Sequence, residues 1–160
     1  MGSRIDLLLR GIDEVFNVSG WQIALREAVD VTAAQAAWSP GPGRNSIWKI
    51  VNHVSLWMED VADCMAGVPP KPKGWAAGAD FREIESVTGE AWRASVERLG
   101  AAHTRLKAEL AKRTDAELDA PSPGRSVALS STILGLIAHD GYHCGQICYL
   151  RALQGIPAGY

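Results

Sequence analysis

The stretch LIAHDGYHCGQICYL, residues 136–150, places His139 and His143 four positions apart in an otherwise apolar run. In an α-helix, residues at this spacing lie on one face, one turn apart. Both imidazoles can therefore point at the same spot. The stretch belongs to a segment of about residues 130–153 whose composition predicts a long helix.

Clusters of glycine and proline divide the rest of the chain into similar segments. These clusters lie at residues 39–46, 67–75 and 120–126 and at the C-terminus. The segments between them have apolar residues at helical spacing and span about residues 4–29, 46–66 and 90–113. Because no alternating strand pattern occurs, the sequence predicts an all-α fold, a four-helix bundle.

Short additional helical turns are expected in two of the connections. One begins at Thr32 and the other at Thr114, and Thr114 and Glu117 have the spacing of a capping box. Asn45 or Ser46 is expected to cap the helix over residues 46–66.

Length and charge limit the function classes. The chain has 160 residues, of which 47% are hydrophobic and 21% charged, so we expect residues 1–160 to form a single domain. The formal net charge is −2 and there is no run of lysine or arginine, which argues against a nucleic-acid partner. A small-molecule substrate is the more natural partner.

The location is expected to be cytoplasmic. The N-terminal residues lack the pattern of a secretory signal, and no apolar run approaches the ~18 residues that would span a membrane. The cysteines Cys64, Cys144 and Cys148 are an odd number without a disulfide-framework spacing, which favours a reducing compartment.

A third histidine can join the pair. On a helical wheel, His139 and His143 lie on the widest apolar stripe of their helix, and His53 lies on the core face of residues 46–66, so three imidazoles can converge from two helices. Neutral imidazole is a good ligand for several divalent metals, and three protein ligands leave one position open for water or substrate. The alternative is that each is an ordinary core or surface histidine.

Other polar residues have more than one interpretation. His103 lies in the core stripe of residues 90–113 and could be a fourth ligand, a partner of a ligand or, as we favour, a hydrogen-bonded core histidine. Asp60 could orient a histidine or bind a substrate cation, but an ion pair with Arg or Lys at the bundle mouth is the favoured alternative. Gln146 could hydrogen-bond a metal-bound water or substrate, or simply cap a polar pocket. Glu59 and Asp140 are expected to project away from the histidines.

The remaining patterns concern packing. Cys144 and Cys148 lie on the face opposite His139, a second apolar face of small residues that could contact a helix of the same bundle or a second subunit. Several tryptophans near helix ends could line a ligand pocket or pack in the core: Trp38, Trp48, Trp57, Trp75 and Trp92.

Three stretches together resemble the DinB-like, or DinB/YfiT-like, metalloenzyme superfamily. They are IAHDGYHCGQICYLRAL (residues 137–153), NHVSLW (52–57) and WSPGPGRNSIWKI (38–50). The resemblance covers nearly the whole chain, and the His-x-x-x-His-x-Gly-Gln segment is its most specific part. It implies a four-helix bundle, often a homodimer, that holds a divalent metal through His53, His139 and His143.

The resemblance also implies a class of reaction. Members with known activity include S-transferases that use bacillithiol or mycothiol and a mycothiol-dependent maleylpyruvate isomerase. A bound divalent ion lowers the pKa of a coordinated thiol or water. We therefore expect a metal-dependent enzyme that transfers a low-molecular-weight thiol to a small electrophile, with zinc or nickel as the metal and iron or manganese as alternatives. The alternatives are a non-catalytic metal- or ligand-binding bundle of the stress response and a metal-dependent hydrolase.

Overall fold

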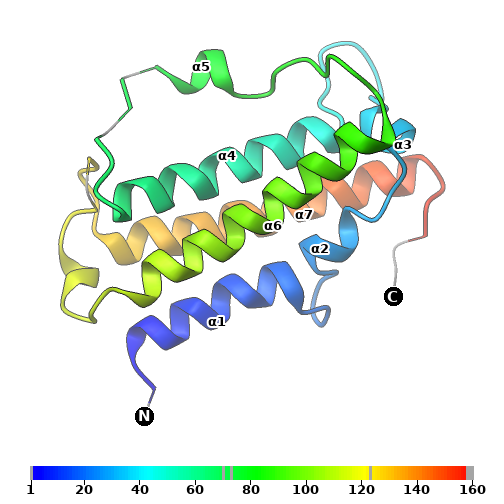
Figure 1. The fold of residues 1–160 in the computed structure, drawn as a ribbon. Coiled ribbons are helices and arrows are strands. Elements are labelled where there is room, and N and C mark those ends of the chain that lie inside the picture. Colours follow the sequence, from blue (N-terminus) through cyan, green and yellow to red (C-terminus); the bar gives the residue numbers. More distant parts are fainter. Residues whose placement is uncertain (1, 70, 73, 123, 158–160) are drawn as a thin grey trace.

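Four long helices form the body of the molecule, as the sequence predicts (Figure 1). They are α1 (Arg4–Asn17), α4 (Ile47–Met65), α6 (Gly89–Ala111) and α7 (Leu129–Leu153). Shorter elements lie in the connections: α2 (Leu25–Ala28), α3 (Ala33–Ala37), α5 (Ala76–Ala79) and the 3-10 turn η1 (Glu117–Asp119). This computed structural model describes residues 2–69, 71–72, 74–122 and 124–157, and no strand occurs within them.

The prediction of one helix over residues 4–29 is wrong. Helix α1 ends at Asn17, Val18 is extended, and a loop separates it from α2. Within this loop the Ser19 hydroxyl donates to Glu27 at 2.6 Å and accepts from the Ala24 N–H at 3.0 Å. These bonds compete with a continuous helix, since a serine side chain can satisfy backbone groups that a helix would otherwise use.

Capping residues mark the other predicted boundaries. Ser46, one of the two expected caps, accepts from the Lys49 N–H at 3.3 Å and begins α4. Thr32 forms a complete capping box at the start of α3. At Thr114 only half of the predicted capping box forms: the Glu117 carboxylate accepts from the backbone N–H at 2.7 Å and from the hydroxyl at 2.8 Å, whereas the Glu117 N–H donates to the Thr114 carbonyl, and η1 begins after Ala116 without a side-chain cap. These local bonds explain why the ends of these helices were readable in the sequence.

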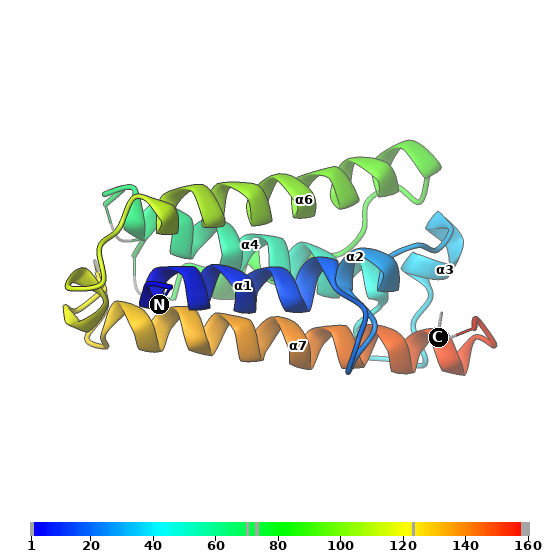
Figure 2. The ribbon, with the colours of Figure 1, turned by 90° about the horizontal axis from the view of Figure 1, so that it is seen from below.

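The helices pack pairwise around one apolar core. Helix α4 packs against both α6 and α7, and α1 packs against the same two helices; Figure 2 shows α1 and α7 side by side. The largest fully buried side chains come from every long helix except α1 and from the short elements: Leu25, Ile47, Met58, Leu99, Leu106, Leu110, Leu118, Ile133 and Ile147. Each such side chain contributes about 1.5–3 kcal/mol of transfer free energy on burial.

The face of α7 that carries Cys144 points into the bundle, not away from it. Cys144 is 2% exposed, and its thiol donates to the Ile23 carbonyl at 3.2 Å. Nearby, a Cβ added to Gly11 would lie 3.0 Å from Ile137 Cδ1, so α1 and α7 approach closely where α1 has no side chain. Cys144 therefore contacts another part of the same chain, which agrees with the first of the two interpretations above.

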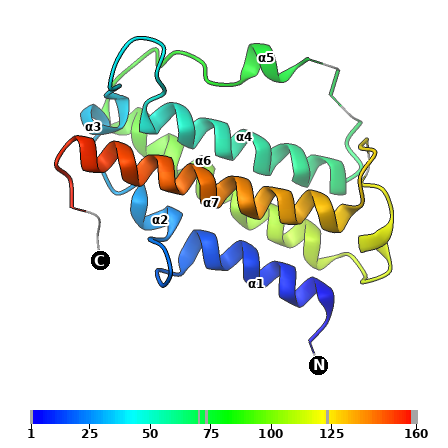
Figure 3. The ribbon, with the colours of Figure 1, turned by 180° about the vertical axis from the view of Figure 1, so that it is seen from behind.

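The connection between α4 and α6 runs back along α4 and carries α5 (Figure 3). Trp75 of this connection packs against Trp57 of α4, with ring centroids 5.7 Å apart, and Lys71 lies over the Trp75 ring at 4.3 Å. Residues of this connection, which belong to no long helix, thus lie at the groove between α4 and α7. None of the described helices is long and apolar enough to cross a bilayer.

Candidate metal centre

The three predicted histidines meet in the groove between α4 and α7. His53 reaches it from α4, and His139 and His143 reach it from successive turns of α7. The Nε2 atom of His139 lies 2.8 Å from that of His53 and 3.1 Å from that of His143. Among the described residues this is the group of histidine, cysteine and acidic side chains that could hold a metal ion.

A hydrogen-bond acceptor orients each imidazole through its other nitrogen. His53 Nδ1 lies 2.6 Å from Asp80 Oδ1, His139 Nδ1 lies 3.0 Å from Asp140 Oδ1, and His143 Nδ1 lies 2.7 Å from Gln146 Oε1. Ionised carboxylates and amide oxygens only accept, so Nδ1 carries the proton in each ring and donates it to the oxygen. All three Nε2 atoms are left with a free lone pair.

Burial keeps two of the rings neutral. Desolvation lowers the pKa of His143 to about 4, and it also lowers the pKa of His53, against the opposing effect of Asp80. His139 is more accessible, with 28% of its side chain exposed. Burial raises the pKa of the Asp140 carboxyl to about 6, although the bond from His139 partly offsets this. Neutral imidazole is the form that binds a metal.

The donor set fits a divalent ion. The lone pair of His139 Nε2 faces those of His53 and His143 at 2.8 and 3.1 Å, and such lone pairs repel unless a cation or a proton lies between them. Ligand nitrogens about 2.0–2.1 Å from a tetrahedral zinc would lie about 3.3 Å apart, close to the two distances from His139, and all three nitrogens lie within 4.8 Å of one another. A metal ion would thus bind the lone pairs of Nε2 atoms to which no proton donor is available among the described residues.

The connection between α4 and α6 contributes a strained dipeptide beside His53. Phe81 stacks on the His53 ring with centroids 4.3 Å apart, and its φ of 47° is in the left-handed region that a non-glycine side chain disfavours. Asp80 Oδ1 accepts from the Phe81 N–H at 3.0 Å as well as from His53. Strain of this kind persists where surrounding contacts hold it, and here those contacts include His53.

The comparison with protein families agrees with this arrangement. The family model described as the DinB superfamily matches residues 18–147. The chain belongs to the DinB superfamily. A comparison with curated proteins returns no match. Helical fold, family and histidine cluster together fit a metal-binding protein.

An open cavity adjoins the histidines of this DinB-superfamily protein. It has a volume of about 560 Å³, and its walls are mostly apolar side chains of α4, α7 and the connections. Apart from the three histidines it is lined by Trp57, Val61, Phe81, Arg125, Val127, Ser131, Thr132, Gly135, Leu136 and Tyr142. A small molecule in this cavity would contact the histidine cluster directly.

The predicted carboxylate Asp60 does not touch the histidines. Its Oδ1 accepts from Lys71 at 3.1 Å and its Oδ2 from Arg125 at 2.5 Å, which is the ion-paired alternative. Gln146 does lie at the cluster, where it accepts from His143 and donates to the Tyr142 hydroxyl at 2.9 Å. It therefore orients a histidine, a role that the sequence did not indicate.

Two aspartates at the cluster were missed from the sequence. The prediction that Asp140 projects away from the histidines is wrong, because its side chain is buried and reaches back to its neighbour His139. Asp80 lies in a connection, where no periodicity reveals which way a side chain points. Asp80 also follows His53 by 27 residues in the sequence, a separation at which no helical spacing indicates a contact between the two side chains.

The fourth histidine of the DinB-superfamily chain is a core residue elsewhere. His103 is 5% exposed and stacks on Phe16 with ring centroids 3.9 Å apart. Its Nε2 lies 3.3 Å from Asp13 Oδ1 but lacks hydrogen-bond geometry. His103 is thus a core residue, as favoured, but its Nε2 makes no hydrogen bond to the residues that the structure describes.

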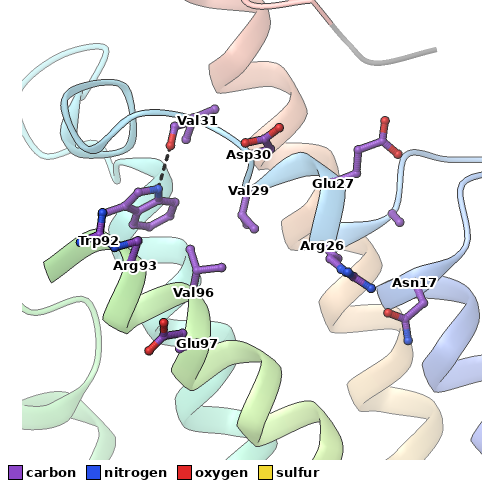
Figure 4. A pocket seen from close by; sticks show the side chains of 11 residues that line it. Asn17, Arg26, Glu27, Val29, Asp30, Val31, Trp92, Arg93, Val96 and Glu97 are labelled. Atoms are coloured by element: carbon purple, nitrogen blue, oxygen red, sulfur yellow. Dashed lines mark hydrogen bonds between the residues drawn. The ribbon is translucent and has the colours of Figure 1, made fainter. Parts of the chain in front are cut away.

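A larger cavity lies elsewhere and lacks such a cluster (Figure 4). It has a volume of about 700 Å³, between α2 and α6, and Trp92 Nε1 donates to the Val31 carbonyl at its edge at 2.8 Å. Trp48 and Trp92 pack against each other with centroids 5.2 Å apart, and both are buried, whereas Trp57 lines the cavity beside the histidines. Trp48 and Trp92 thus have the predicted core role and Trp57 the predicted cavity role, whereas Trp38 is exposed.

Proposed function

We propose that the protein is a divalent-metal-dependent enzyme that transfers a low-molecular-weight thiol to a small electrophilic substrate. The observation that carries the proposal is the convergence of three unprotonated Nε2 atoms, of His53, His139 and His143, at the wall of an open apolar cavity. Zinc or nickel is the expected ion, since both accept imidazole ligands, and iron or manganese are alternatives. A bound ion of this kind lowers the pKa of a coordinated thiol to give a thiolate near neutral pH.

The protein's own residues orient the ligands and exclude water. Asp80, Asp140 and Gln146 hold the imidazoles in one tautomer, so that the three nitrogens need no rearrangement when an ion binds. Phe81 from the connection stacks on the His53 ring, and Trp57 of α4 lies edge-on to it. An apolar wall strengthens the electrostatic interaction between a thiolate and an electrophile, because it removes competing water.

Elemental analysis of the untagged protein tests the first step. About one divalent ion per chain is expected, and the absence of a stoichiometric ion would refute the proposal. A panel of low-molecular-weight thiols, each with an electrophilic acceptor, tests the second step. Consumption of both reactants supports thiol transfer. Ester or amide hydrolysis without thiol would instead show a hydrolase, and binding without turnover would show a stress-response binding protein.

The assembly and location belong to the same proposal. Helix α7 exposes several large apolar side chains, Leu134, Tyr142, Tyr149 and Leu153, which supports the homodimer that the family resemblance implies. The three cysteines are free, which supports a reducing, cytoplasmic location. Light scattering on the purified protein measures the assembly directly, and a monomer at micromolar concentration would contradict the dimer.

A further inference from the structure

The cavity beside the histidines has a polar residue at its far end. Between the two ends the walls are apolar, with Trp57 and Val61 from α4 and Leu136 from α7. Arg125, in the connection that precedes α7, contributes the cationic group at the end away from the histidines. The cavity therefore has two chemically different ends joined by an apolar surface.

The length of this surface follows from the helix geometry. Arg125 donates to Asp60 at 2.5 Å, and Asp60 follows His53 by seven residues on α4. At a rise of 1.5 Å per residue, seven residues span about 10 Å along the helix axis. The Arg125 guanidinium and the histidine cluster are thus about 10 Å apart along the helix axis, about the length of an extended eight-carbon chain.

The far end has an excess of positive charge. Asp60 is shared by Arg125 and Lys71, and both of its oxygens are in use. Lys71 also lies 3.4 Å from Asp63, which is itself paired with Arg105 at 2.6 Å. This network has three cations and two carboxylates, so one positive charge is not compensated within it.

Arg125 also has unused donors. Its guanidinium donates to Asp60, and among the described residues it makes no other side-chain hydrogen bond. The first turn of α7 has the same sign of potential, since Ala128 provides no side-chain cap and no acidic residue occurs in that turn. Ser131 and Thr132 of this turn line the cavity. An anionic group at this end would be favoured by both the arginine and the helix terminus.

We propose that the cavity binds an elongated, largely apolar molecule that ends in a carboxylate, with the carboxylate at Arg125 and the opposite, reacting end at the histidine cluster. The inference rests on the proposed function for the role of the histidines, and it adds the class of the substrate. Arg125 is the residue that selects for the anionic end, and the apolar walls select for the body of the molecule.

Calorimetric titration with three probes tests the proposal. Octanoate has both the apolar body and the carboxylate, octanamide has the same body without charge, and acetate has the charge without the body. We expect octanoate to bind about tenfold more tightly than octanamide, the usual effect of a charge-assisted hydrogen bond, and acetate to bind weakest. Equal affinity for octanoate and octanamide would overturn the proposal.

Two matched variants locate the carboxylate. Arg125→Gln should reduce octanoate affinity about tenfold and leave octanamide unchanged. Arg98→Gln is the control, because Arg98 also pairs with a carboxylate of α4, Glu59 at 2.6 Å, but does not line the cavity. Thermal unfolding of both variants checks that they are folded. If Arg98→Gln lowers octanoate affinity as much as Arg125→Gln, the assigned site is wrong.

The carboxylate of octanoate could instead bind at the histidine cluster. In the His139→Ala variant we expect octanoate to retain its preference over octanamide, since Arg125 is unchanged. Loss of the preference in this variant, with no effect of Arg125→Gln, would overturn the proposal. Metal content is measured separately on the same samples. A protein without metal refutes the proposed enzyme, whereas loss of carboxylate preference in a metal-loaded protein refutes only this inference.

A larger side chain in the cavity wall tests the cavity itself. Val127 is exposed and lines the cavity, so Val127→Trp should weaken binding of both eight-carbon probes.

Discussion

The groove between α4 and α7 and the groove between α1 and α6 contain nearly the same side chains. Each has a buried histidine that stacks on a phenylalanine and lies beside an aspartate: His53, Phe81 and Asp80 in the first, and His103, Phe16 and Asp13 in the second. Each also has a cavity, with volumes of about 560 and 530 Å³. A histidine stacked on a phenylalanine beside an aspartate therefore does not by itself mark a metal centre, and the α4–α7 groove differs in holding two further histidines, His139 and His143.

The difference lies in which ring nitrogen faces the aspartate. Asp80 binds Nδ1 of His53, which leaves Nε2 free to face the imidazoles of α7. Asp13 lies beside Nε2 of His103 and is paired with Lys107 at 2.5 Å, so this nitrogen faces an ion pair instead of other ligands. The orientation of the ring, together with the two imidazoles of α7 that it faces, therefore separates a candidate metal centre from a packed core histidine.

Removal of one histidine should have the largest effect. His139→Ala removes the central of the three nitrogens, so we expect loss of nearly all bound metal and of thiol transfer. His103→Gln, in the other groove, should retain about one ion per chain. Elemental analysis after dialysis measures both. Equal metal loss in the two variants would contradict the distinction between the grooves.

The two phenylalanines should separate stability from metal binding. Phe16→Ala leaves a cavity in the core and should lower the free energy of unfolding by about 3 kcal/mol without loss of metal. Phe81 is only partly buried, so Phe81→Ala should cost about 1 kcal/mol or less and weaken metal retention instead. Urea unfolding and elemental analysis on both variants give the comparison, and a reversed order would show that Phe81 is the structural residue.

The aspartates should have an intermediate effect. Asp80→Asn and Asp140→Asn each weaken the acceptor that orients an imidazole, so each should reduce metal affinity about 10- to 100-fold. Asp13→Asn is the matched change in the other groove and should leave metal affinity unaltered. Competition with a chelator of known affinity measures all three. Full affinity in both Asp80→Asn and Asp140→Asn would mean that these aspartates do not position the ligands.

The smallest expected effect is the contribution of His103 to the loss of stability at acidic pH. Burial lowers its folded-state pKa below the unfolded value of about 6.5, although Asp13 opposes this and Lys107 adds to it. The unfolded chain thus binds more protons as the pH falls below about 6.5, and stability that is complete above that value declines as the pH falls through the folded pKa. His103→Gln should make this decline smaller, as measured by urea midpoints between pH 7.5 and 5. His53 and His143 also have lowered pKa values and contribute to the decline, whereas the raised pKa of Asp140 opposes it, so the comparison is made between His103→Gln and the unchanged protein. An unchanged pH profile would show that His103 is not one of the groups responsible.

Local patterns in the sequence determined most of the helices and two-thirds of the histidine cluster. Caps such as Ser46 act within a few residues, and the four-residue spacing of His139 and His143 is a property of any helix, so both could be read without the fold. The sequence also placed His53 on a core face of its helix. The break after Asn17 was missed because it depends on side-chain bonds of Ser19 that an apolar pattern does not reveal.

Tertiary structure decided which face of α7 enters the bundle and which groups hold the histidines. Helix α7 is apolar on most sides, so the width of its stripes could not show that Cys144 is buried against Ile23, in the loop between α1 and α2. Asp80 reaches His53 only because the connection after α4 folds back over the groove, and His103 is excluded only because α6 faces α1 at that point. Periodicity is a property of one helix, whereas a site made of two helices and a loop depends on how they are packed together.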